Sequence, residues 1–245
     1  MQEIVDAALR RQRATVLIAL GVGLGTGLLL FWAKGVGGFV ALLAPLPALA
    51  FVVLTLWHLF RAPGTAELRV DPGSRSFFSA PRRLPTLLAV LSGWLAFQAV
   101  DGVRQADEDR VLVLLAALAA LVCVMSVLVS WSRVPFVAVT PEGLSIGAPR
   151  PQAVVPWVTL DQQAPARPPN GIDTVLRLTV TRPELTRRAG WWARKPFFVP
   201  VRELEVAPAL LVDAIRYYVA HPEHRAAIGT PEEYARLRQA LTAGR

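Results

Sequence analysis

Four long apolar runs fill most of the first 132 residues of this chain and limit what it can fold into. They cover residues 15–33, 36–60, 84–100 and 111–131. An α-helix rises about 1.5 Å per residue, so about 20 apolar residues cross the roughly 30 Å hydrocarbon core of a bilayer. The run at 84–100 is slightly short for this and the others are long enough. We therefore expect residues 1–132 to form four transmembrane helices.

The composition also favours a membrane protein. Hydrophobic residues make up 53% of the chain and charged residues 18%, which would leave too much apolar surface exposed on a purely water-soluble fold. Of the 26 basic residues only Lys34 and Lys195 are lysines. With the abundance of Ala and Leu, this bias is typical of a GC-rich bacterial genome, and we expect a bacterial cell (plasma) membrane protein.

The distribution of basic residues predicts the orientation of the helices. Three Lys or Arg residues precede the first run and five lie in residues 61–83, whereas the other two loops together hold three. The positive-inside rule then places both termini in the cytoplasm. The net charge of +8 suits an anionic inner leaflet, so no nucleic-acid partner is expected. The acidic loop at 101–109 lies outside, as a solvated segment or, alternatively, a cation site.

Small residues and prolines mark two of the predicted helices. The first run contains two overlapping G-x-x-x-G spacings, which allow another helix to approach closely. The glycines that we expect to pack against a helix are Gly21, Gly23, Gly25 and Gly27. Leu28 excludes a nucleotide-binding G-x-G-x-x-G loop. Pro45 and Pro47 predict a kink in the second run, and a transport site at such a broken helix is the alternative.

After Trp131 the pattern changes to short β-branched and aromatic segments broken by Pro and Gly, typical of antiparallel strands. Strands are predicted near 135–140, 144–147, 154–161, 174–181 and 197–201, with a tight turn at 140–143. A helix follows, with Pro208 in its first position and Leu211, Ile215 and Tyr218 at helical spacing. The chain is thus predicted to be an α+β membrane protein with a globular domain at 133–222.

This domain resembles the bacterial pleckstrin-homology-like (PH-like) domain. The resemblance rests on "VTPEGLSI" at 139–146, "VVPWVTL" at 154–160 with Trp157 after a proline, and "FFVPVREL" at 197–204. It implies a β-sandwich or partial barrel capped by one helix, used for binding and not for catalysis. The 140–143 turn offers only Glu142 where phosphoinositide-binding relatives carry Lys and Arg, so headgroup recognition by that loop is not predicted.

The loop at 61–83 is predicted to form a cytoplasmic β-hairpin, "LRVDPGSRSFFSAPR". It is similar to "VAVTPEGLSIGAPR" at 137–150, and each hairpin follows two apolar runs. Either the chain contains a degenerate duplication or two Pro-Gly turns are alike by chance. In both cases the hairpin can add strands to the sheet of the globular domain.

A basic and aromatic segment, "RRAGWWARK", lies at 187–195, within a stretch from 183 to 195 that is predicted to be a loop or an extended hairpin. Tryptophan prefers the bilayer interface and basic groups are attracted to anionic lipid. The residues expected to contact the membrane surface are Arg187, Arg188, Trp191, Trp192, Arg194 and Lys195. Packing of the two indoles against the sandwich is the alternative, and a protein or single-stranded nucleic acid is a weaker one.

The tail at 223–245 is predicted to contain a separate helix. Thr230 caps it, Pro231 is its first residue and Glu233 completes a capping box. Tyr234, Leu237 and Leu241 form a narrow apolar stripe, which docks either on the domain or on a partner.

The sequence contains no recognisable catalytic motif. The single cysteine, Cys123, lies in an apolar run, and His58, His221 and His224 do not form a convergent metal site. We expect no enzyme activity, no cofactor and no metal. The predicted function is an integral membrane protein presenting a cytoplasmic binding or scaffolding domain to an unidentified protein partner. A small transporter or channel component is the alternative.

Overall fold

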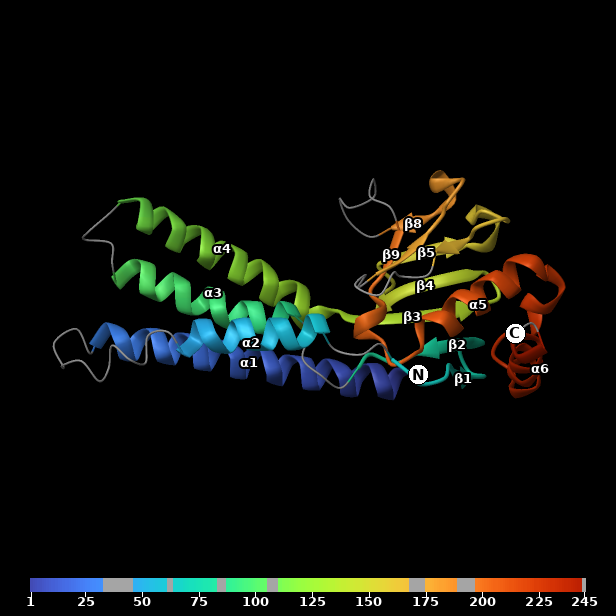
Figure 1. Ribbon diagram of the computed structural model, residues 1–245, viewed down its shortest axis with the longest axis horizontal. Coiled ribbons are helices and arrows are strands. Elements are labelled where there is room, and N and C mark those ends of the chain that lie inside the picture. The colour runs from blue at the N-terminus through green and yellow to red at the C-terminus, as the bar shows by residue number, and fades with distance from the viewer. Residues whose placement is uncertain are drawn as a thin grey trace. The chain divides into compact units, whose positions relative to one another are not determined.

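The computed structural model describes residues 1–32, 46–60, 64–82, 87–104, 110–167, 175–188 and 197–243. Helices and antiparallel strands make up a mixed α+β protein (Figure 1). The chain divides into two compact units. A helical unit comprises Ala7–Arg61 and Arg83–Ser132, and a globular unit comprises Met1–Asp6, Ala62–Arg82 and Arg133–Arg245.

The described part of the helical unit contains four helices. They are α1 (Gln2–Trp32), α2 (Leu46–Phe60), α3 (Leu87–Arg104) and α4 (Arg110–Ser132). Helix α1 begins well before the apolar run that predicted it, and its first residues belong to the globular unit. Pro47 is the second described residue of α2, so the kink predicted at Pro45 and Pro47 stays a prediction. Pro45 lies outside the described residues.

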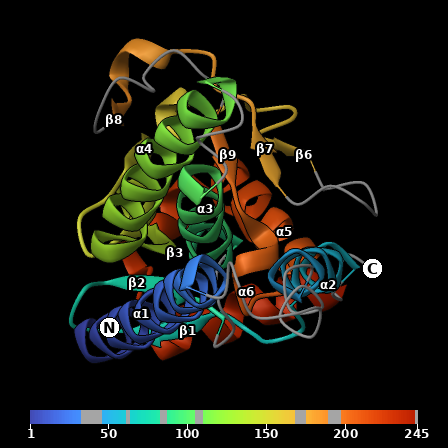
Figure 2. The ribbon, with the colours of Figure 1, turned by 90° about the vertical axis from the view of Figure 1, so that its left-hand side faces the viewer.

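Side-chain contacts fix the directions of the helices within this unit. The Gln12 amide donates to the carbonyl oxygen of Ser130, so the start of α1 lies beside the end of α4. The Cys123 thiol donates to the carbonyl oxygen of Ser92 at 3.2 Å. A Cβ atom on Gly102, near the end of α3, would lie 2.7 Å from Cβ of Ala116, near the start of α4. With these two contacts, helices α3 and α4 run antiparallel, and they lie side by side in both ribbon views (Figure 1, Figure 2).

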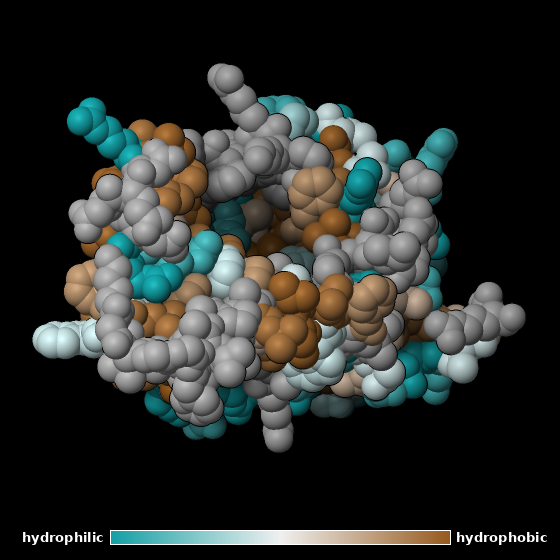
Figure 3. All heavy atoms as spheres, turned by 60° about the vertical axis from the view of Figure 1, so that its left-hand side comes forward, coloured by the Kyte–Doolittle hydropathy of each residue, from teal (hydrophilic) through white to brown (hydrophobic). Residues whose placement is uncertain are grey.

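Two of the described helices, α1 and α4, are long and apolar enough to cross a membrane. Much of their apolar surface is exposed: Leu29 is 67% exposed on α1 and Leu114 is 71% exposed on α4. Hydrophobic residues at the surface of the chain are brown in Figure 3. This exposure is the opposite of what a buried core helix shows, and it suggests membrane association.

The globular unit is built on a six-stranded antiparallel sheet of order β1-β2-β3-β4-β5-β8. Its strands are β1 (Arg69–Asp71), β2 (Ser76–Ser79), β3 (Val134–Thr140), β4 (Gly143–Ala148), β5 (Ala153–Pro156) and β8 (Arg187–Arg188). Strand β2 pairs with β3, so that Phe77 is opposite Val139. The hairpin between α2 and α3 thus supplies two strands to the sheet formed by residues after α4.

Alternation along the strands gives the sheet a face toward the core. Phe77, Val137, Val139 and Leu144 are each completely buried there. A second, three-stranded sheet contributes to the same core, with order β6-β7-β9. Its strands are β6 (Ala166–Arg167), β7 (Leu176–Leu178) and β9 (Phe197–Val199).

One strand was predicted too long. The strand expected at 154–161 stops at Pro156, and Trp157–Thr159 form a 3-10 turn. The segment from 183, predicted to be a loop or an extended hairpin, contains a 3-10 turn, Pro183–Leu185, and then β8, whose Arg187 pairs with Val154. The pairing of β8 with β5 joins segments far apart in the sequence, which a local pattern does not report.

Helix α5 (Pro208–Ala220) closes the core, and Pro208 is its first residue, as predicted. The predicted stripe of Leu211, Ile215 and Tyr218 is completely buried. A 3-10 segment, Pro222–Ala227, leads to α6 (Pro231–Ala243). Leu237 of α6 is fully buried in the same core, so the apolar stripe of the tail docks on the domain.

Candidate functional site

A hollow in the globular unit lies beside the end of α5 and has a volume of about 550 Å³. Small-molecule and peptide sites commonly have this size. Segments far apart in the sequence form its wall: the turn after β5, the residues after β7, and the end of α5 with the following 3-10 segment. The lining residues are Trp157, Val158, Leu160, Asp161, Gln162, Gln163, Thr181, Arg182, Val219, Pro222 and Arg225.

Trp157 forms the rigid side of this hollow. The 3-10 turn after Pro156 directs its indole inward, where only 4% of the residue is exposed. Its Nε1 donates to the carbonyl oxygen of Thr140 at 2.9 Å. Its ring centroid lies 6.0 Å from that of Tyr218 on α5. With its polar atom hydrogen-bonded and its ring packed against Tyr218, the indole cannot rotate without disrupting these core contacts.

Arg225 lies over the Trp157 indole, with its Cζ 5.4 Å from the ring centroid. Its Nε donates to the carbonyl oxygen of Tyr218 at 2.6 Å and its Nη2 to that of Val219 at 3.1 Å. These carbonyls belong to the last turn of α5, so the guanidinium caps the negative end of the helix. Partial burial lowers the pKa of Arg225.

The mouth of the hollow combines an apolar contact with charge. Val158 is 58% exposed beside it, and Arg182 is exposed on the facing segment. The Asp161 carboxylate accepts a hydrogen bond from the backbone N–H of Gln163 at 3.0 Å. This bond holds residues 161–163 of the rim in a turn. The hollow therefore offers an aromatic wall, an exposed apolar residue and charged groups of both signs. These features suit the binding of a ligand more than catalysis.

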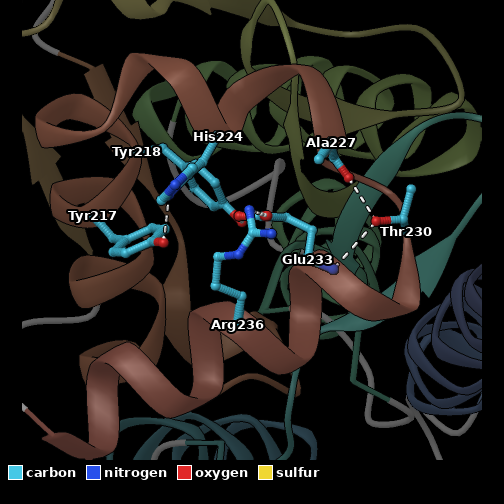
Figure 4. Close-up of polar contacts among 7 residues, drawn as sticks. All are labelled: Tyr217, Tyr218, His224, Ala227, Thr230, Glu233 and Arg236. Carbon is cyan, nitrogen blue, oxygen red and sulfur yellow. Dashed lines mark hydrogen bonds and ion pairs between the residues drawn. The ribbon is translucent and has the colours of Figure 1, made fainter.

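A buried polar group joins α5 to α6 next to the hollow (Figure 4). The side chain of Glu233 is 1% exposed. It accepts a hydrogen bond from the Tyr218 hydroxyl at 3.2 Å and pairs with Arg236 at 2.8 Å. Burial, followed by the nearby Glu233 charge, raises the pKa of Tyr218. The group orients α6 on the domain.

The predicted capping box of α6 is half correct. The Thr230 hydroxyl accepts a hydrogen bond from the Glu233 amide at 3.2 Å, as an N-cap does. The Thr230 amide, however, donates to the carbonyl oxygen of Ala227, and the Glu233 carboxylate points toward Tyr218 instead (Figure 4).

The two C-terminal histidines form a ring stack with Tyr217. The His221 and His224 rings are 5.5 Å apart and 5° from parallel, and the Tyr217 hydroxyl is 2.6 Å from Nδ1 of His224. Among the described residues, no group of three His, Cys, Asp or Glu side chains is placed to hold a metal ion. The side chain of His58 lies outside the described residues.

The predicted membrane-contact residues are described only in part. Arg187 is exposed on the edge strand β8, and Arg188 pairs with Ala153 of β5. Trp191, Trp192, Arg194 and Lys195 lie outside the described residues.

The four glycines of α1 fall on two different faces. A Cβ atom on Gly23 would lie 2.0 Å from the carbonyl oxygen of Gly93 on α3, and one on Gly27 would lie 2.8 Å from Cβ of Val100. At Gly21 and Gly25 a Cβ atom would meet nothing within 4 Å. One of the two G-x-x-x-G spacings, formed by Gly23 and Gly27, thus faces α3.

No protein-family model, curated protein or solved structure matches this chain.

Sequence reasoning found Trp157 but not the hollow beside it. Trp157 stood out as a tryptophan after a proline in a short strand. Arg225 carried no signal, because it lies in a short segment between two helices and its role depends on the last turn of α5 meeting the turn after β5.

Proposed function

We propose that this chain is a multi-pass membrane protein whose globular unit is a cytoplasmic binding module. The observation that carries this proposal is that three separate segments of the chain form the globular unit. These segments are residues 1–6, 62–82 and 133–245. The segments between them, 7–61 and 83–132, make up the helical unit.

This connectivity supports four crossings of the bilayer. A folded unit lies on one side of a membrane, so each of the two intervening segments is expected to cross an even number of times. Among the described residues, each segment has one helix long and apolar enough to span, α1 in the first and α4 in the second. In the proposed topology, helices α2 and α3 supply the return crossings, and both termini lie on the side of the globular unit.

Arginine and tryptophan residues at the ends of α1 and α4 fit the two surfaces of a bilayer. Arg13 Nε donates to the carbonyl oxygen of Trp131 at 3.1 Å, with its guanidinium 5.3 Å from the Trp131 ring centroid. From Arg13 to Trp32 is about 28 Å along α1, and from Arg110 to Trp131 about 31 Å along α4, at about 1.5 Å per residue. Both lengths match a hydrocarbon core of roughly 30 Å, and tryptophans favour its boundaries.

The hollow beside Trp157 is the proposed binding site of the module. Its wall is held rigid by core contacts, and rigid aromatic walls bind a partner at little entropic cost. Two antiparallel sheets closed by α5 are compatible with the PH-like resemblance, and PH-like domains are binding modules. The ligand class that fits is a protein segment with an apolar side chain for the Val158 rim and polar groups for Asp161 and Arg182.

The basic edge at 187–195 is proposed to contact anionic lipid of the inner leaflet. Each basic group near such a surface contributes roughly 1 kcal/mol. Exposed Arg187 on β8 supports this proposal. It would limit the orientations of the module at the membrane.

Site-specific photo-crosslinking in the native host tests the binding proposal. A photoreactive residue replaces Val158 at the hollow or, as a control, Leu185, which is 48% exposed on the same unit but does not line the hollow. We expect a discrete protein product from position 158 and none from 185. Equal products at both positions, or none at 158, would contradict a partner site at the hollow.

A further inference from the structure

A second hollow lies entirely within the helical unit, along the seam of α3 and α4, with a volume of about 430 Å³. Its floor contains the small residues Gly102, Ala116 and Ala119, and its rim contains leucines such as Leu115 and Leu118, each 55% exposed. Small residues at a membrane-helix surface let another helix approach closely. The full lining is Trp94, Leu95, Gln98, Asp101, Gly102, Leu112, Leu115, Ala116, Leu118, Ala119 and Val122.

The side chain of Gln98 opens into this hollow and has no hydrogen-bond partner among the residues that the structure describes. Gln98 lies about 9 Å along α3 from Arg104, at about 1.5 Å per residue. In the proposed four-span topology this depth is inside the hydrocarbon. A primary amide there has two donors and an acceptor and no water to bond with, so it favours a protein partner.

The charged group at the outer end of the hollow is already neutralised. The Asp101 carboxylate pairs with Arg104 at 2.6 Å. No net charge therefore opposes the approach of an identical surface. A different protein would need a polar group at the depth of Gln98, whereas a second copy supplies one automatically.

We propose that two copies of this chain associate through the α3–α4 hollow, with the Gln98 amides hydrogen-bonded to each other. Copies inserted in the same orientation are related by a two-fold axis along the membrane normal, which brings each residue to the same depth as its equivalent. An amide is self-complementary, because its N–H groups donate to the oxygen of another amide. The proposal rests on the four-span topology proposed above.

Disulfide crosslinking of the full chain in native membranes tests this association. The single cysteine is first removed as Cys123→Ser, since a serine hydroxyl can also donate to the Ser92 carbonyl. A new cysteine is then placed at Leu118 on the hollow or at Leu121, which is 60% exposed on α4 but does not line it. Oxidation is expected to give a dimer with Leu118→Cys and little with Leu121→Cys.

Gln98 is tested in the same background. Gln98→Leu is expected to lower the association constant roughly threefold to thirtyfold, the range for a hydrogen bond between membrane helices, and Gln98→Asn is expected to restore most of it. A Leu118→Cys yield no higher than that of Leu121→Cys, or one unchanged by Gln98→Leu, would overturn the proposal. Retention in alkali-washed membranes is measured on every variant: loss from the membrane refutes the topology, whereas retention without a dimer refutes only the association.

Discussion

The Tyr218 hydroxyl donates a hydrogen bond to the buried Glu233 carboxylate at 3.2 Å, across the junction of α5 and α6. Removing the hydroxyl leaves the carboxylate in the core with Arg236 as its remaining charged partner. Tyr218→Phe is therefore expected to lower the free energy of unfolding by about 1–3 kcal/mol, the cost of an unsatisfied buried polar group. Chemical denaturation of the full chain in detergent, followed by tryptophan fluorescence, measures this change.

Tyr217→Phe is the matched control for that substitution. Its hydroxyl bonds to His224 in a partly exposed position, where water can replace the lost partner. We expect a smaller loss than for Tyr218→Phe. Equal losses would mean that the Tyr218–Glu233 contact has no special role at the junction.

The chain has three tyrosines, and burial is the main cause that raises the pKa of each of them. The unfolded state releases these protons near pH 10, about the ordinary value, while the native state still holds them. Stability is therefore constant with respect to these groups below about pH 10 and falls as the pH rises above it.

The measurement is a tyrosinate absorbance titration alongside circular dichroism. Tyrosine ionisation in the native protein is expected to occur at a higher pH than in free tyrosine. The tyrosinate absorbance is expected to increase over the same pH range in which the structure is lost. A titration complete near the ordinary pKa with the fold intact would contradict the buried position of Tyr218 and the partly buried positions of Tyr217 and Tyr234.

The α1–α3 contact predicts opposite behaviour for neighbouring glycines. Gly23→Ala places a Cβ atom against the Gly93 backbone, which must move, so the melting temperature in detergent is expected to fall. Gly21→Ala and Gly25→Ala meet open space, and alanine favours a helix over glycine, so these variants are expected to melt at the same temperature or slightly higher. A fall for all three would place the α3 contact elsewhere.

The shared sheet makes the hairpin necessary for the globular unit. A fragment of residues 133–245 lacks β1 and β2 and the completely buried Phe77. It is expected to remain unfolded, with poorly dispersed amide resonances, whereas a fragment that joins 64–82 to 133–245 through a flexible linker is expected to fold. In the full chain, Phe77→Ala is expected to cost about 3–5 kcal/mol. A well-folded 133–245 fragment would show that the hairpin is dispensable.

The sequence predicted the elements with strong periodicity better than it predicted their partners. The positions of Pro208, Leu211 and Ile215 at helical spacing correctly located α5 and its buried face. The partner of the 61–83 hairpin was left open, because an alternating strand reports which face is buried and not which strand lies beside it. The same limit explains why the pattern at 183–195 did not separate a loop from an extended hairpin, whereas Arg187 lies in β8, paired with β5.

The candidate site was even less accessible to sequence reasoning. Trp157 drew attention as a residue type, but the hollow depends on Arg225 capping the last turn of α5, more than 60 residues away in the chain. Glu233 illustrates the complementary error. Its spacing from Thr230 fits a capping box, and only the packed position of Tyr218 shows that the carboxylate is used elsewhere.

Cysteine accessibility in intact cells tests the central claim, that three separate segments form one cytoplasmic unit joined by two membrane-crossing helix pairs. In a Cys123→Ser chain, single cysteines replace Thr65, Glu142 or Asp107, and a membrane-impermeant maleimide is applied before or after permeabilisation. The account predicts that the Asp107 position is labelled from outside, and that the Thr65 and Glu142 positions are labelled only after permeabilisation. Labelling of Thr65 and Glu142 from opposite sides of the membrane, or of both from outside, would contradict it.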